Sequence, residues 1–200
     1  MKHRNLIIAA RVISLVFTPF YLPVVGLTAL FVFSYLSLLP FRYKAAVVGL
    51  AYLFTVLAPT LLIHAYRRYN GWTPVERRMV PYVISIACYF ACVYLMERMH
   101  IPRFMGGILI AALLIQITCA VINAWWKIST HTAAIGGVAG ALFAFADIFG
   151  FNPVGWLCGV FMLAGLLGTS RMILRQHTLA QVVAGFWVGF ACAVVGILFV

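Results

Sequence analysis

The stretch GTSRMILRQHTLAQ, residues 168–181, joins two strongly apolar segments that we place at residues 154–169 and 177–199. A helix needs about 20 predominantly apolar residues to cross the hydrocarbon core of a bilayer. The second segment meets this requirement and the first is somewhat short. The pair is predicted to form a transmembrane helical hairpin, with two arginines and a histidine close together in its turn.

Five further apolar segments precede this hairpin, and short turns separate them. They lie at residues 18–39, 45–64, 80–97, 104–125 and 131–149. The composition agrees, because 66% of the residues are hydrophobic and 8% are charged, whereas soluble domains carry about a quarter charged residues. The sequence therefore predicts an all-α fold, a polytopic transmembrane helical bundle of six to seven spans.

The N-terminal stretch MKHRNLIIAARVISLVF has the charged start of a signal peptide. Arg11, however, interrupts its apolar part, and no small-x-small cleavage site follows cleanly. We expect it to be retained as an amphipathic helix at the membrane interface. Since nearly every residue is needed for the spans or their turns, we expect a single membrane domain over residues 1–200.

The charge balance is strongly positive, with 14 lysines and arginines against three acidic residues. In a membrane protein such a balance is explained by topology or by an anionic ligand such as lipid phosphate. Nucleic acid is excluded as a partner, because the basic residues are scattered in short turns without an aromatic-interleaved patch. The five cysteines lie in apolar segments without zinc spacing, so neither a metal nor another cofactor is predicted.

The turn WKIST, residues 126–130, supplies Lys127 and leads into His131. Ser129 or Thr130 can cap the span that follows. The free N–H groups and partial positive charge of a helix N-terminus favour an anion. This turn is therefore a candidate for binding one.

The turn after the sixth segment contributes a second set of polar side chains. These are Ser170, Arg171, Arg175, His177 and Gln181. Because two spans separate this turn from His131, both turns reach the same membrane surface and the two histidines can meet. Arginine offers bidentate hydrogen bonds to phosphate oxygens, and histidine can attack or transfer a proton near neutral pH. Together these residues favour a site for a phosphate ester.

The same residues resemble the signatures of the type 2 phosphatidic acid phosphatase family. The run Ser170-Arg171-x5-His177-x3-Gln181 resembles the family's Ser-Arg-x5-His-x3-Asp, and Ser129-Thr130-His131 is similar to the Ser-Gly-His of its Pro-Ser-Gly-His motif. The resemblance covers roughly residues 76–199. It implies N-terminal spans over residues 1–75 and a phosphatase-like core over residues 76–200.

The resemblance also implies roles for individual residues. His177 would attack phosphorus to form a phosphohistidine, and His131 would protonate the leaving oxygen and then activate water. Phosphate-binding roles are expected for Arg171, Ser129, Ser170, Lys127, Arg77 and Arg78. The family's chemistry requires no metal.

The sequence departs from the family pattern in each of the family's three motifs. Ile128 and Thr130 stand where the family has proline and glycine, and Gln181 stands where it has aspartate. A glutamine carbonyl can accept the histidine N–H, but it does not stabilise an imidazolium as a carboxylate would. The family's upstream Lys-x6-Arg-Pro motif is not present as such, and we assign its place to Arg77 and Arg78.

We therefore predict a membrane phosphatase that hydrolyses a lipid phosphate monoester or an isoprenyl pyrophosphate, whose tail stays in the lipid. Lipid phosphate and membrane lipids are the expected partners, with no obligate protein partner. The expected location is integral and multi-pass, in a bacterial inner membrane. Two alternatives remain. One is a non-catalytic relative that binds anionic lipid through the same residues, and the other is a small transporter whose arginines and histidines line a pathway.

Overall fold

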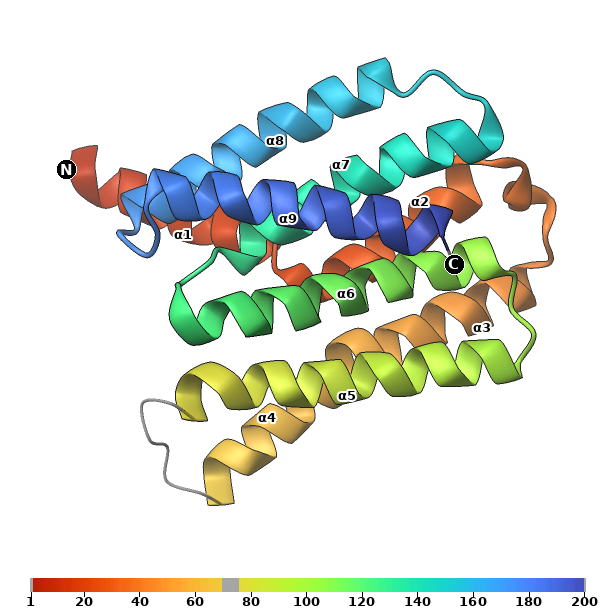
Figure 1. Ribbon diagram of the computed structural model, residues 1–200, viewed down its shortest axis with the longest axis horizontal. Coiled ribbons are helices and arrows are strands. Elements are labelled where there is room, and N and C mark those ends of the chain that lie inside the picture. Colours follow the sequence, from red (N-terminus) through yellow and green to blue (C-terminus); the bar gives the residue numbers. More distant parts are fainter. Residues whose placement is uncertain (1, 70–75, 200) are drawn as a thin grey trace.

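The computed structural model describes residues 2–69 and 76–199, and every regular element in these ranges is helical. Figure 1 shows long helices running side by side along one direction. Seven helical stretches of the described chain are long and apolar enough to cross a membrane, which confirms the predicted all-α, polytopic bundle. These stretches are Asn5–Phe33, Phe41–Tyr69, Met79–Arg98, Arg103–Trp125, Thr130–Phe149, Val154–Ile173 and Leu179–Leu198.

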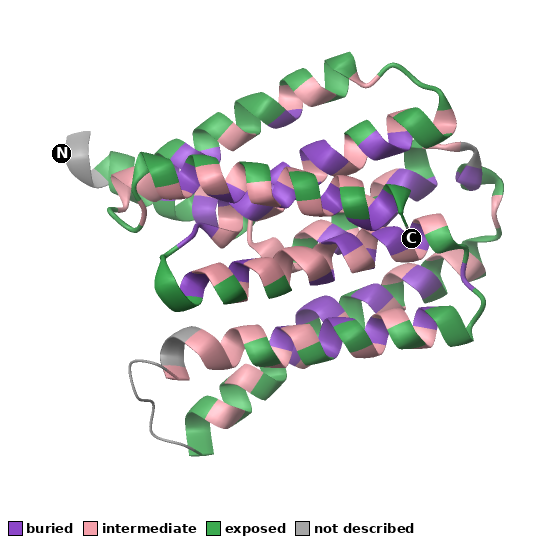
Figure 2. Cartoon of the chain, viewed as in Figure 1, coloured by how far each residue is buried: buried purple, intermediate pink, exposed green. Residues whose placement is uncertain are grey.

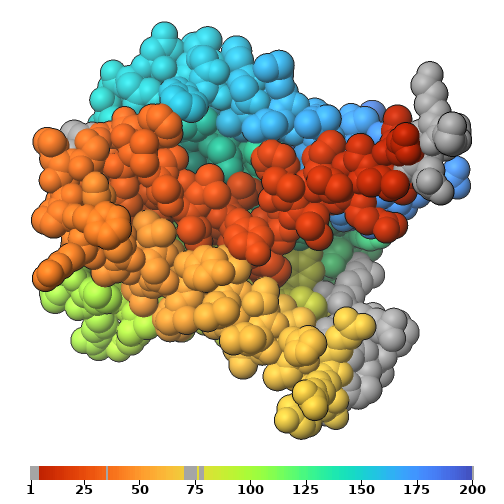
Figure 3. All heavy atoms as spheres, turned by 180° about the vertical axis from the view of Figure 1, so that it is seen from behind, coloured from red at the N-terminus to blue at the C-terminus, as the bar shows by residue number. Residues whose placement is uncertain are grey.

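The first stretch is composite, because Pro19 and Pro23 lack the N–H groups that a continuous helix would use. It consists of α1 (Lys2–Val16), the short 3-10 turn η1 (Pro19–Tyr21) and α2 (Leu22–Phe33), with η2 (Tyr35–Leu38) following. The helix predicted at the interface, α1, packs against α8 (Val154–Ile173). Figure 3 shows α1 and α2 crossing the rear face of the bundle beside α8.

The second stretch contains a π-helical turn, η3 (Leu53–Leu57), between α3 (Phe41–Tyr52) and α4 (Ala58–Tyr69). This turn immediately precedes Pro59, whose missing N–H disturbs regular α-helical bonding. The remaining helices are α5 (Glu76–Arg98), α6 (Arg103–Trp125), α7 (Thr130–Phe149) and α9 (Leu179–Leu198). The sixth segment is longer than predicted: α8 continues to Ile173, so Ser170 and Arg171 belong to its last turns.

The closest helix packing joins α7 to α9. Gly136 and Gly140 of α7 lie against the backbone carbonyls of Phe186 and Phe190, and Gly189 of α9 lies against that of Ala133. A Cβ atom at any of these glycines would overlap the opposite backbone. Small residues allow such an approach in lipid, where packing rather than water exclusion holds helices together.

Gly155 and Gly159 of α8, which are also four residues apart, differ from these glycines, because a Cβ at either position would meet open space. The contacts of α8 with its neighbours therefore do not depend on these two glycines. Figure 2 shows the buried residues concentrated in the middle of the bundle and exposed residues on its outside. Large apolar side chains such as Phe90, Met162 and Trp187 are exposed there, as expected for a surface that faces lipid.

The glycine contacts predict unequal effects of one added methyl group. Gly136→Ala and Gly189→Ala should each lower the free energy of unfolding by about 1–3 kcal/mol or more, because overpacking forces the backbones apart. Gly159→Ala should leave stability nearly unchanged, since the new Cβ meets open space. Thermal unfolding of the detergent-purified variants measures the difference. Equal Tm values for all three would contradict the α7–α9 packing described here.

Candidate functional site

A hydrogen bond joins the two turns singled out in the sequence. The backbone N–H of Ser129 donates to the carbonyl oxygen of Gln181 over 3.4 Å. Next to this bond, Gly185 of α9 faces the same turn, and a Cβ there would lie 2.6 Å from the carbonyl oxygen of Ser129. The turn before α7 and the first turns of α9 are therefore in direct contact.

Ser129 caps α7, which resolves the choice between Ser129 and Thr130. Its buried hydroxyl accepts the N–H of Thr132 at 3.4 Å, and the Thr132 hydroxyl donates to the Ser129 carbonyl at 3.0 Å. Neither of these bonds uses the N–H groups of Thr130 and His131. The N-terminus of α7 thus offers N–H groups and partial positive charge to an anion.

His131 and His177 lie at the two sides of this contact, His131 in the first turn of α7 and His177 two residues before α9. Both are partly buried. Within the described part of the chain, the buried Nδ1 atoms of both histidines and the Nε of Arg171 have no hydrogen-bond partner. Buried polar atoms in folded proteins are normally paired, so these three nitrogens are available to a ligand.

Arg171 reaches the same region from the last turn of α8. Its Nη1 donates to the hydroxyl of Ser14 in α1 over 2.6 Å, and Ser14 is buried. The backbone of Ser14 is also within hydrogen-bonding reach of His131. A residue near the N-terminus therefore lies between the two motifs.

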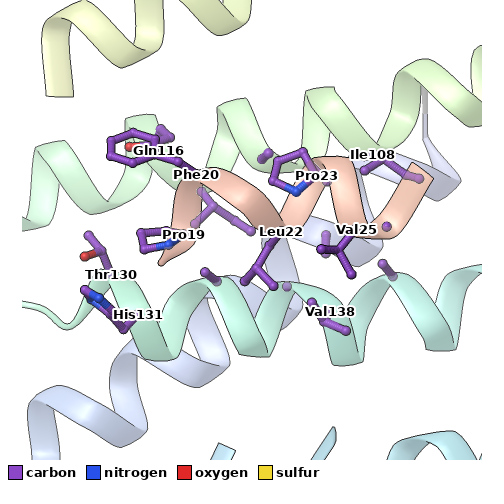
Figure 4. Close-up of a pocket in the computed structure, with 18 of the residues that line it drawn as sticks. Pro19, Phe20, Leu22, Pro23, Val25, Ile108, Gln116, Thr130, His131 and Val138 are labelled. Atoms are coloured by element: carbon purple, nitrogen blue, oxygen red, sulfur yellow. The ribbon is translucent and has the colours of Figure 1, made fainter. Parts of the chain in front are cut away.

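A long apolar cavity of about 880 Å³ begins at the histidines. Lys127, His131 and His177 line its polar end, and α2, α6 and α7 supply most of its walls. Figure 4 shows Thr130 and His131 at one end near Pro19, with apolar side chains further along. The cavity reaches Phe149, at the opposite end of α7, so it follows a helix of 20 residues, or about 30 Å.

A second cavity, of about 610 Å³, lies between α1 and the end of α8. Arg11, Ser14, Arg171 and Arg175 line it, and His131 borders both cavities. Arg175 lies two residues after the end of α8 and has a left-handed backbone with φ of 51°. This cavity therefore collects cationic side chains around one edge of the site.

Several predicted site residues have other partners. The Ser170 hydroxyl is buried, donates to the Leu166 carbonyl at 2.8 Å and lines neither of the two cavities. The structure thus does not bring Ser170 to the predicted phosphate position, since its own helix takes the hydroxyl. Arg77 and Arg78 lie in the first turn of α5, but their side chains lie outside the described residues.

Gln181 takes part in the capping of α9. Its Oε1 accepts the backbone N–H of Thr178 at 3.1 Å, and its own N–H donates to the Thr178 hydroxyl at 3.4 Å. This reciprocal pair is a capping box. The Gln181 side chain is also within hydrogen-bonding reach of His177, although Nδ1 of that histidine has no partner among the described residues. The carbonyl oxygen that we expected to orient His177 therefore also accepts the N–H of Thr178.

Sequence reasoning missed Ser14 and Arg11 as residues near the site. Together with Thr18 they follow a spacing of three and four residues, which places all three on one face of the N-terminal segment. All three line the second cavity. This row of polar residues in an otherwise apolar segment is the sequence feature that could have indicated their place near the site.

Burial lowers the pKa of His177 from its ordinary value of 6.5 to about 4. The positive charges of Arg171 and then Lys127 act in the same direction, and a contact with the Gln181 side chain opposes them. His177 is therefore neutral at pH 7, the form in which an imidazole can act as a nucleophile. As the pH falls below 6.5 the unfolded chain takes up this proton first, so the contribution of His177 to stability decreases toward pH 4.

This pKa is directly measurable. In a ¹⁵N-imidazole NMR titration, the signal that disappears in His177→Gln should have a midpoint well below 6.5. Lys127→Met should move that midpoint upward, because it removes one of the cations that disfavour protonation. A His177 midpoint at or above 6.5 would contradict the described environment.

A comparison with family models identifies the part of the chain that contains these motifs. Residues 123–200 match the model described as the PAP2 superfamily, a range that includes His131, Arg171 and His177. No curated protein and no solved structure matches the chain. The match confirms the resemblance found in the sequence, and residues 123–200 are similar to the PAP2 superfamily.

Proposed function

We propose that this chain is an integral membrane phosphatase that hydrolyses a lipid phosphate monoester or an isoprenyl pyrophosphate. The PAP2 superfamily match supports a phosphatase-type function in general. The observation that best supports a lipid substrate is that His131 and His177 lie at the polar end of an apolar cavity of about 880 Å³. A phosphate at that end would leave its tail inside the bundle.

In the proposed reaction, neutral His177 attacks phosphorus and the bond to the leaving oxygen breaks. His131, protonated in the complex with the anionic phosphate, gives this proton to that oxygen, so the alcohol or phosphate departs with the proton and His177 carries the phosphoryl group. Water then attacks phosphorus while His131 takes its proton, which releases phosphate and restores His177. In this proposal Arg171, Lys127 and the N–H groups at the start of α7 stabilise the phosphoryl charge.

The neighbouring residues suggest supporting roles that differ from those expected. Ser129 caps α7 and joins it to α9, so we assign it the positioning of the α7 N–H groups. Gln181 caps α9 and lacks the charge by which a carboxylate would stabilise a phosphorylated imidazole. We therefore expect slow turnover in the natural protein.

The second candidate function is binding of anionic lipid without turnover. It is favoured by Gln181, an uncharged side chain beside His177 whose carbonyl also caps α9. This reading predicts affinity for lipid phosphate that depends on Arg171. The seven apolar helical stretches indicate a multi-pass membrane protein, and a bacterial inner membrane stays a prediction, as does the lack of an obligate protein partner.

Phosphate release in EDTA tests the two functions. With a panel of lipid phosphates and pyrophosphates, His177→Ala should reduce release to background and His131→Ala should reduce it by about 10²–10⁴-fold, because each removes a participating imidazole. Gln181→Asp should raise the rate by restoring a carboxylate beside His177. His64→Ala, on the exposed side of α4, is the control.

Each other outcome has a defined meaning. Release that persists in His177→Ala would overturn the proposed mechanism. Lipid-phosphate binding without release, in both the parent and Gln181→Asp, would support the non-catalytic function. Loss of activity in EDTA that a divalent cation restores would contradict metal-independent chemistry.

The apolar cavity gives a prediction about the substrate's tail. Ala112 of α6 lines this cavity, and Ala112→Leu would narrow it. The kcat/KM for a long-chain lipid phosphate should fall by about tenfold or more, with little change for a short water-soluble phosphate. Ala191→Leu, on the exposed face of α9, is the matched control. Equal losses for both chain lengths would mean that the tail does not occupy the cavity.

A further inference from the structure

The hydrogen bond between Arg171 and Ser14 connects residues 123–200, which match the PAP2 family model, to helix α1, which lies outside the matched residues. Ser14 is 7% exposed and its oxygen lies 2.6 Å from Nη1 of the guanidinium. The hydroxyls of Thr28 and Ser170 donate to carbonyl groups of their own helices. The Ser14 hydroxyl instead accepts a hydrogen bond from α8, 157 residues away.

The surroundings of Arg171 explain why such a contact matters. Its guanidinium borders a cavity of about 610 Å³, and a long arginine side chain has considerable rotamer freedom when nothing fixes it. Arg11 and Arg175 line the same cavity, and their like charges favour movement of Arg171 away from them. A hydrogen bond to a charged donor is among the stronger ones, so Ser14 selects one position of a side chain that would otherwise have several.

We propose that Ser14 is a positioning residue for Arg171, and that α1 thereby forms part of the phosphate site. The inference rests on the proposed function in one respect, namely that Arg171 binds the phosphoryl oxygens. Ser14 uses one Nη1 donor, and the buried Nε remains free of protein partners within the described residues. The backbone of the same serine reaches His131, so one turn of α1 sets the spacing between the cation and the second histidine.

Threonine and valine have nearly the same shape, so substituting each of them for Ser14 separates the effect of the hydroxyl group from the effect of side-chain volume. Ser14→Thr keeps the acceptor, whereas Ser14→Val replaces it with a methyl group. The affinity for inorganic phosphate, measured by ³¹P NMR or calorimetry on the full-length protein, should weaken by about tenfold in the valine variant and remain near the parental value in the threonine variant. Thr28→Ala, which removes an exposed α2 hydroxyl, is the control and should bind phosphate normally.

A double-mutant cycle tests whether Ser14 acts through Arg171. In an Arg171→Gln background, Ser14→Val should cause no further loss of phosphate affinity, because the charged donor is already gone. Losses that multiply independently, or equal affinity in the threonine and valine variants, would overturn the proposal. Phosphate binding requires no turnover, so this result stands apart from the phosphatase assay: an inactive parent whose affinity depends on Ser14 through Arg171 would refute the reaction and keep the positioning role.

Discussion

The contact between α7 and α9 is the constraint on which the site depends. Gly136, Gly140 and Gly189 let the two backbones touch, and the same approach brings the turn at Ser129 against Gln181. A wider separation would move the α7 N-terminus away from His177, which immediately precedes α9. The packing of α7 against α9 therefore also assembles the polar site. The position of each histidine depends on this packing and not on its local sequence alone.

Much of this arrangement could be predicted from the sequence, because span length and motif spacing are local properties. The hairpin around Arg171 and the return of His177 to the level of His131 follow from counting apolar residues. The partners of individual hydroxyls and amides could not be predicted. The Ser170 hydroxyl donates to its own helix, and the Gln181 side chain accepts the N–H of Thr178 in the cap of α9. Which partner each side chain takes depends on competition among the hydrogen-bonding groups nearby. The contact between Ser14 and Arg171 depends on the tertiary packing of two helices, because the two residues are 157 positions apart in the sequence.

The electrostatics of the site differ from those of a carboxylate-assisted histidine. Burial and the neighbouring cations Arg171 and Lys127 keep the pKa of His177 near 4. Such surroundings favour an anionic group and disfavour a protonated imidazole. Phosphate binding would change this balance, since its negative charge offsets the cations. The empty site and the occupied site are therefore expected to hold different protonation states.

The apolar cavity also determines where binding energy can originate. For the proposed lipid substrate, moving the tail from the bilayer into the bundle exchanges one hydrocarbon environment for another, so the transfer would gain little of the free energy that water exclusion supplies. Under this proposal, affinity would come mainly from the head group, through Arg171, Lys127 and the N-terminus of α7. The cavity would select among tails by excluding chains that do not fit. A molecule that competes with the proposed substrate would accordingly gain affinity through its anionic group rather than through a longer chain.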